Sequence, residues 1–228
     1  MSWHATGRAS PRWNANLAFV SGAFSGWKGD FQGFFLGLRA NNSKPYFDSH
    51  RVLYEKEVKA PMVALLAELE PEFGPARLSR PNRDIRFSAD KSPYKTNIYA
   101  SAAGGGYVAL DATGLVAAGG RYMMEAQDLV RFRESVAAGR SGAKVAGIVA
   151  ALRDKGYEIG GPELKRVPSP HPQDHPRAEL LRHKKLIYWR RWEIGPWIAT
   201  PIVLDRVANA WRDGLDLNAW FTANVDRE

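Results

Sequence analysis

Apolar residues recur at helical spacing through the first third of the chain. Four of them fall at i, i+3, i+4 and i+7 and predict one face of a helix: Phe31, Phe34, Phe35 and Leu38. The pair Asn41-Asn42 is expected to end this helix. Ser43 is a typical N-cap residue, and Pro45 suits the first turn of a second helix. An apolar stripe follows at Val58, Met62, Leu65, Leu66 and Leu69. Because Pro61 lies inside the stripe, we expect either a kink or two helices that meet end to end.

Alternation of polar and apolar residues predicts β-strands in the middle of the chain. Between residues 77 and 88 the alternation puts Arg83, Ile85 and Phe87 on one strand face, and Asp84 and Arg86 on the other. Three further short strands are expected over residues 96–102, 107–110 and 115–118. The turns between these three strands are short and rich in glycine, which indicates antiparallel pairing.

Helical periodicity returns after the strands. Leu129, Phe132 and Val136 predict a helix ended by Gly139, and a second helix is expected from Ser141 to Gly156. Residues 157–167 are expected to form a short extended segment, and residues 168–176 a proline-rich loop. We expect Asp174 to cap a helix that carries Leu180 and Leu181. A strand is expected over residues 185–192, and a final helix starts at Thr200 and pauses at Gly214.

The order of helices, strands and helices predicts the fold class. We expect an α+β fold, a single domain whose central antiparallel sheet, a meander, is packed by N-terminal and C-terminal helices. Residues 1–21 lack periodicity and are expected to be a poorly ordered N-terminal extension to a domain over residues 22–228. A chain of 228 residues is long enough to bury a sizeable core.

Composition excludes several classes of protein. The chain has 45% hydrophobic and 25% charged residues, as in an ordinary globular protein. No run approaches the roughly 20 apolar residues of a membrane span, so we expect no membrane partner. The chain has no cysteine, which removes disulfides, thiolate nucleophiles and cysteine-ligated metals. These features together predict a cytoplasmic protein.

Positive charge is concentrated in two segments of this basic chain, whose net charge is +8. Residues 75–100 contain six Lys/Arg against two Asp/Glu, and residues 163–191 contain eight against three. Localised charge of this kind is typical of a binding site or a basic patch. One prediction is therefore a nucleic-acid-binding module that uses both segments, in which aromatic residues interleave with Arg190 and Arg191.

The sharper prediction concerns residues 83–95, RDIRFSADKSPYK. Arginine forks and lysine ammonium groups suit a phosphate or a carboxylate, and the two aspartates suit a role in orienting the arginines. Four cations against two carboxylates leave a surplus that favours a small anionic ligand. The predicted ligand-binding residues are Arg83, Asp84, Arg86, Asp90, Lys91, Tyr94 and Lys95, with His175 and Arg177 as further candidates.

Two other interpretations compete with ligand binding. The charged motif could instead be a structural ion-pair network in an interaction protein. Removing one partner of a buried ion pair destabilises a fold by about 3–5 kcal/mol, which is enough to explain a charged motif without any ligand. The histidine cluster at residues 171–175 lacks the helical spacing typical of zinc sites, so no metal is expected. The residues identify no cofactor, no catalytic group and no oligomeric state, and they leave open whether the ligand-binding protein is an enzyme.

Several segments together resemble the uncharacterised family called domain of unknown function 2461. They are residues 24–27 (FSGW), Asn41-Asn42, Tyr54, Ala60-Pro61, residues 83–97 (RDIRFSADKSPYKTN), Gly106-Tyr107, Gly119-Gly120, residues 175–177 (HPR) and residues 180–182 (LLR). The resemblance covers about residues 24–225 and implies a single-domain, mainly cytosolic protein without an established activity. The chain departs from the family pattern at residues 44–46 (KPY), where members usually have arginine, an acidic residue and tryptophan. If this segment lined a site, ligand contacts there would differ.

Overall fold

The structure is a computed structural model that describes residues 23–161 and 164–226. Within these residues, six strands form one sheet in the order β1-β2-β3-β4-β6-β5, and every neighbouring pair is antiparallel. The strands are β1 (Ala76–Leu78), β2 (Asn97–Ala102), β3 (Gly106–Asp111), β4 (Gly114–Arg121), β5 (Glu158–Gly160) and β6 (Leu186–Glu193). The predicted α+β fold with a central antiparallel sheet is confirmed. The expected N-terminal extension over residues 1–21 lies outside the described residues.

The two N-terminal helices form where the apolar pattern and the capping residues predict them. Helix α1 (Phe31–Ala40) buries its four predicted core residues. At the start of this helix, the Asp30 carboxylate accepts the Gly33 N–H at 2.8 Å. Helix α2 (Lys44–Ser49) is capped by Ser43, whose hydroxyl accepts the Tyr46 N–H at 3.3 Å. The short turn between α1 and α2 later forms one side of the candidate site.

Pro61 is accommodated inside a nearly continuous helical segment. After α3 (Arg51–Leu53) the chain forms a π-helix, η1 (Tyr54–Lys59), and then α4 (Ala60–Phe73). Pro61 thereby falls in the first turn of α4, where a missing N–H is tolerated. A π-helical turn thus comes directly before α4, at the position where we expected either a kink or two helices that meet end to end. The predicted apolar stripe is buried along this segment.

Residues 83–88 do not form the strand that their alternation predicts. Strand β1 ends at Leu78, and residues 79–96 form a loop between β1 and β2 with one isolated bridge, Asn82 to Tyr94. Pro81 and Pro93 have no N–H to donate to a ladder, so the pairing of β1 with β2 stops before them. Phe87 is 96% exposed instead of facing a core. We name residues 79–96 the β1–β2 loop.

The C-terminal helices also correct two details. Helix α5 (Ala126–Ala137) ends two residues before Gly139, which begins α6 (Gly139–Asp154) instead of ending the helix before it. Asp174 does not cap α7 (Ala178–Leu181), because α7 starts after Arg177, and the His175 Nδ1 accepts the Arg177 N–H at 3.0 Å. The remaining elements are η2 (Pro196–Ala199), a 3-10 helix, α8 (Ile202–Asp213) and α9 (Leu215–Asn224).

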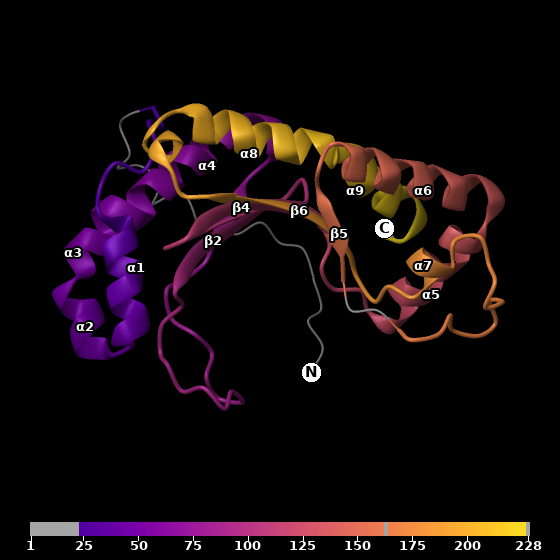
Figure 1. Ribbon diagram of the computed structural model, residues 1–228, viewed down its shortest axis with the longest axis horizontal. Coiled ribbons are helices and arrows are strands. Elements are labelled where there is room, and N and C mark those ends of the chain that lie inside the picture. Colours follow the sequence, from indigo (N-terminus) through magenta and orange to yellow (C-terminus); the bar gives the residue numbers. More distant parts are fainter. Residues whose placement is uncertain (1–22, 162–163, 227–228) are drawn as a thin grey trace, which may run out of the picture.

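Helices from both ends of the chain pack on one face of the sheet. Figure 1 shows α4, α8, α9 and α6 along that face, with α1 to α3 at one end and α5 and α7 at the other. The facing strand residues are fully buried, among them Val108 and Leu115, and Trp211 of α8 lies directly over Gly106. One continuous hydrophobic cluster runs from Phe24 to Val225 and makes the described residues a single domain. None of the described helices combines the length and the apolar character that crossing a bilayer requires.

A candidate anion-binding pocket

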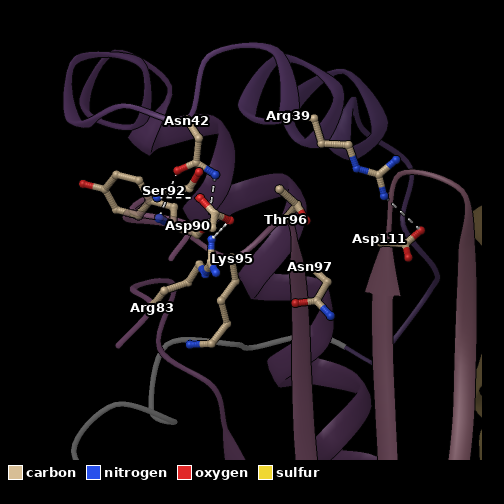
Figure 2. Close-up of a pocket in the computed structure, with 10 residues that line it drawn as sticks. Arg39, Asn42, Arg83, Asp90, Ser92, Lys95, Thr96, Asn97 and Asp111 are labelled. Atoms are coloured by element: carbon tan, nitrogen blue, oxygen red, sulfur yellow. Dashed lines mark hydrogen bonds and ion pairs between the residues drawn. The ribbon is translucent and has the colours of Figure 1, made fainter. Parts of the chain in front are cut away.

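A cavity of about 510 Å³ opens where the turn between α1 and α2 meets the β1–β2 loop, the start of β2 and the end of β3. Its walls come from segments that are far apart in the sequence and meet only in the fold, as Figure 2 shows. The lining residues are Arg39, Asn42, Arg83, Asp90, Ser92, Tyr94, Lys95, Thr96, Asn97 and Asp111. Four of the nine predicted ligand-binding residues are among them: Arg83, Asp90, Tyr94 and Lys95.

Asp90 holds Arg83 at the pocket. The Arg83 guanidinium forms an ion pair with the Asp90 carboxylate, and the Arg83 N–H donates to the Pro93 carbonyl at 2.8 Å. Asp90 also accepts the Ser92 N–H at 2.9 Å. Hydrogen bonds from Ser92, and then from Arg83, keep the pKa of Asp90 well below its ordinary value. Asp90 therefore stays ionised and orients the arginine, as the sequence predicts.

Asn42 joins the end of the β1–β2 loop to the helical turn. Its side-chain Nδ2 donates to the Tyr94 carbonyl at 3.0 Å, and its Oδ1 accepts the Tyr94 N–H at 3.0 Å. The Tyr94 ring stacks on Phe47 of α2, with 4.2 Å between ring centroids and 6° between planes. Tyr94 is only 6% exposed, so its main contribution is to fix the loop rather than to offer a free aromatic surface.

The Lys95 ammonium group is held in place by backbone carbonyls, and no carboxylate of the described residues pairs with it. Its Nζ donates to the carbonyl oxygens of Arg80 at 2.6 Å and Asn82 at 2.7 Å. Burial, together with the nearby Arg80 charge, lowers the pKa of Lys95 from its ordinary value of 10.5. At neutral pH, Lys95 therefore brings a positive charge to the pocket that no acidic side chain neutralises among the described residues.

Arg39 and Asp111 form the opposite wall (Figure 2). The closest approach of their charged atoms is 3.9 Å, a loose contact. Asp111 is shared with Arg191 of β6, whose Nη2 donates to both carboxylate oxygens at 2.9 and 3.1 Å. Burial alone would raise the pKa of Asp111, but hydrogen bonds from Thr113 and Arg191 outweigh burial and lower it. Three cations thus line the pocket against two carboxylates, one of which is also bound by Arg191.

Part of the charged motif lies outside the pocket. Arg86 donates to Asp84 through Nε at 3.0 Å and Nη2 at 2.7 Å, and both side chains are exposed. Hydrogen bonds from the side chain and the backbone of Arg86 lower the pKa of Asp84 to about 2. Lys91 is exposed and donates to the Ile85 carbonyl at 3.1 Å. The four predicted cations therefore split into two that line the pocket and two that do not.

His175 and Arg177 do not join the charged motif. Arg177 donates to the last carbonyl oxygens of α5, at Val136 (2.6 Å), Ala137 (2.8 Å) and Ala138 (3.2 Å). It thus satisfies the free carbonyls of a helix C-terminus, a structural role. Figure 1 places α5 and α7 at the end of the molecule away from α1 and α2. Within residues 23–161 and 164–226, no three His, Asp or Glu side chains group closely enough to hold a metal ion.

Six lining residues were not among the predicted ligand-binding residues: Arg39, Asn42, Ser92, Thr96, Asn97 and Asp111. Asn42 was expected to end a helix, and Asp111 directly follows the strand expected over residues 107–110, so neither position indicated a pocket. The family departure at residues 44–46 lies outside the pocket lining. There the Tyr46 hydroxyl donates to the Phe34 carbonyl at 3.0 Å and packs α2 against α1.

Comparison with protein families covers almost the whole described chain. The family model described as "Conserved hypothetical protein (DUF2461)" matches residues 30–220, a span that contains every lining residue of the pocket. A comparison with curated proteins finds no match. The match confirms the resemblance seen in the sequence, and the chain belongs to the DUF2461 family of conserved hypothetical proteins.

Proposed function

We propose that the protein binds a small anionic ligand, a phosphate or a carboxylate, in the pocket between the α1–α2 turn and the β1–β2 loop. The observation that carries this proposal is that Arg39, Arg83 and Lys95 line one cavity, whose described lining residues include two carboxylates. A structural ion-pair network has no need for such a surplus. Lys95 supports the proposal most, because its charge faces backbone carbonyls rather than an acid.

The remaining lining groups suit an anion as well. The side chains of Thr96 and Asn97 offer a hydroxyl and an amide, and neither has a hydrogen-bond partner among the described residues. Arginine supplies paired donors in one plane, and lysine supplies a point charge. The cavity of about 510 Å³ falls within the range that small-molecule sites occupy.

Binding, rather than proton transfer, is the activity that this geometry supports. The pKa values of Asp90 and Asp111 both lie below their ordinary values, so the two carboxylates are weak bases. Their contacts fit the role of holding arginines in place. The cytoplasmic location expected from the composition stays a prediction.

A nucleic-acid interface is less well supported. The arginines of the second basic segment make internal contacts: Arg177 binds the end of α5, Arg190 donates to the Lys155 and Gly156 carbonyls, and Arg191 pairs with Asp111. A small ligand in a cavity uses the described contacts better than a polymer would.

Matched variants within one motif test the proposal. Calorimetric titration of a panel of phosphate and carboxylate compounds should identify a ligand whose affinity falls about tenfold or more in Arg83→Gln, because a charge-assisted hydrogen bond is lost. Arg86→Gln removes the same charge from the same loop, outside the pocket, and should leave the affinity within about twofold. The proposal fails if no compound of the panel binds, or if both variants weaken binding equally.

A further inference from the structure

The sheet face that lies opposite α8 and α9 borders the pocket. Asn97 lines the pocket, and Tyr99 lies two residues further along β2, so its side chain is on the same face. The Lys95 Nζ lies 5.7 Å from the centroid of the Tyr99 ring. The cationic pocket and this aromatic side chain are therefore neighbours, about 7 Å apart along the strand.

Tyr99 belongs to an aromatic surface that spans several strands. Its ring lies 5.6 Å from the Tyr107 ring of β3, centroid to centroid, with 31° between planes. Tyr107 pairs with Ala118 of β4, and Ala118 pairs with Trp189 of β6. Tyr99 pairs with Ala109. Small residues thus lie beside the rings and leave their faces partly exposed.

The opposite face of the same strands is buried under the helices. There Gly106 lies against the Trp211 ring, and Val108 and Leu110 are fully buried under the helices. Tyr99 and Tyr107 are only partly buried. A partly buried pair of aromatic rings beside a cationic pocket provides two kinds of contact at once, stacking and charge pairing.

We infer that the ligand of the pocket carries a planar aromatic or heteroaromatic ring joined to its anionic group. The anion lies among Arg39, Arg83 and Lys95, and the ring lies against the Tyr99–Tyr107 pair. The spacing along β2 fits a sugar-sized or similarly short linker between the two groups. This inference rests on the proposed function and narrows it to one class of ligand.

A ligand series in which only the ring changes tests the inference on the unaltered protein. The probes are ribose 5-phosphate, adenosine 5′-monophosphate and phenyl phosphate, titrated by calorimetry at fixed salt. Stacking of one ring on an aromatic side chain predicts that at least one ring-bearing probe binds about tenfold more tightly than ribose 5-phosphate. Equal affinities for all three probes would overturn the inference.

Substitutions separate the ring contact from the charge contact. Tyr99→Ala should bring the ratio of the ring-bearing probe's affinity to the ribose 5-phosphate affinity down to about one, whereas Tyr99→Phe should keep that ratio. Phe87→Ala removes the exposed aromatic ring of the β1–β2 loop and should change neither affinity. If Tyr99→Ala does not fold, the probe series on the unaltered protein still decides the outcome.

The outcomes distinguish the inference from the proposal beneath it. If Arg83→Gln weakens all three probes and the ring adds nothing, the anion site stands and the inference fails. If no probe binds, the inference fails together with the anion site for these phosphates. If a single-stranded oligonucleotide binds far more tightly than any monomer and with steep salt dependence, the site belongs to a polymer and the inference is also overturned.

Discussion

Lys91 and Lys95 have the same charge in the same loop but very different surroundings. Lys91 is exposed and has one carbonyl partner, whereas Lys95 is half-buried against two carbonyls beside the pocket. Burial lowers the pKa of Lys95. We therefore expect the affinity for an anionic ligand to depend on the protonation of Lys95.

The pH dependence of binding follows from the lowered pKa of Lys95. Anion affinity should fall as pH rises through that pKa, which lies below 10.5, because the ammonium charge is lost there. The same shift disfavours the charged form in the folded protein, so its contribution to stability is recovered, not lost, as pH rises. Lys95→Gln should bind weakly and lack this alkaline decline, and Lys91→Gln should retain it. Titrations from pH 7 to 10.5 provide the measurement, and a decline unchanged in Lys95→Gln would contradict the assignment.

Arg177 should act on stability and not on ligand binding. Arg177→Met leaves three carbonyl oxygens at the end of α5 without their charged donor and should lower the free energy of unfolding by about 1.5–3 kcal/mol. Arg140→Met, at an exposed position of α6, is the matched control and should change the free energy of unfolding by less than about 0.5 kcal/mol. Urea denaturation measures both. An unchanged midpoint in Arg177→Met would contradict the capping role.

These residues show what the sequence could and could not predict at this scale. The charge of each side chain is known from the sequence, so an ion pair between Arg83 and Asp90 could be predicted. Arg177 donates to backbone carbonyls, which every residue has, so residue types alone do not identify its partners. Those partners follow only from the tertiary structure. Arg39 and Asp111 meet across 72 positions of sequence for the same reason.

At the scale of elements, the β1–β2 loop depends on its attachment to the α1–α2 turn. Asn42→Ala removes two hydrogen bonds to Tyr94 and should lower the free energy of loop opening by about 1–2 kcal/mol. Hydrogen exchange of peptides from residues 79–96 should then accelerate, and anion affinity should fall with it. Asn41→Ala is the control, because the Asn41 side chain makes no hydrogen bond within the described residues. Equal exchange in the two variants would contradict the attachment.

Elements with a strong period were predictable, and the loop was not. The buried faces of α1, α4 and α8 follow the 3.6-residue period, and β2 and most of β4 alternate between buried and less buried residues. The β1–β2 loop also alternates, but a strand needs a partner. Pro81 and Pro93 remove the donors that would extend the ladder, which a period-2 pattern alone does not reveal.

At the scale of the whole molecule, one hydrophobic cluster joins the N-terminal and C-terminal helices through the sheet. Calorimetry should therefore record a single unfolding transition, with the van't Hoff enthalpy close to the calorimetric one. Two separated transitions would contradict the single domain. A ligand that binds only the folded state should raise the transition temperature further as its free concentration increases above its Kd.

The anion site itself is best tested by mapping where a ligand binds. Amide chemical shifts of the isotope-labelled protein should be recorded while a phosphate or carboxylate compound identified by titration is added. The shifts should move first and furthest at Asn42, Arg83, Lys95, Asn97 and Asp111, the residues that enclose the pocket. Shifts centred on α5 and α7 around Arg177, or spread evenly over the surface without saturation, would contradict the site.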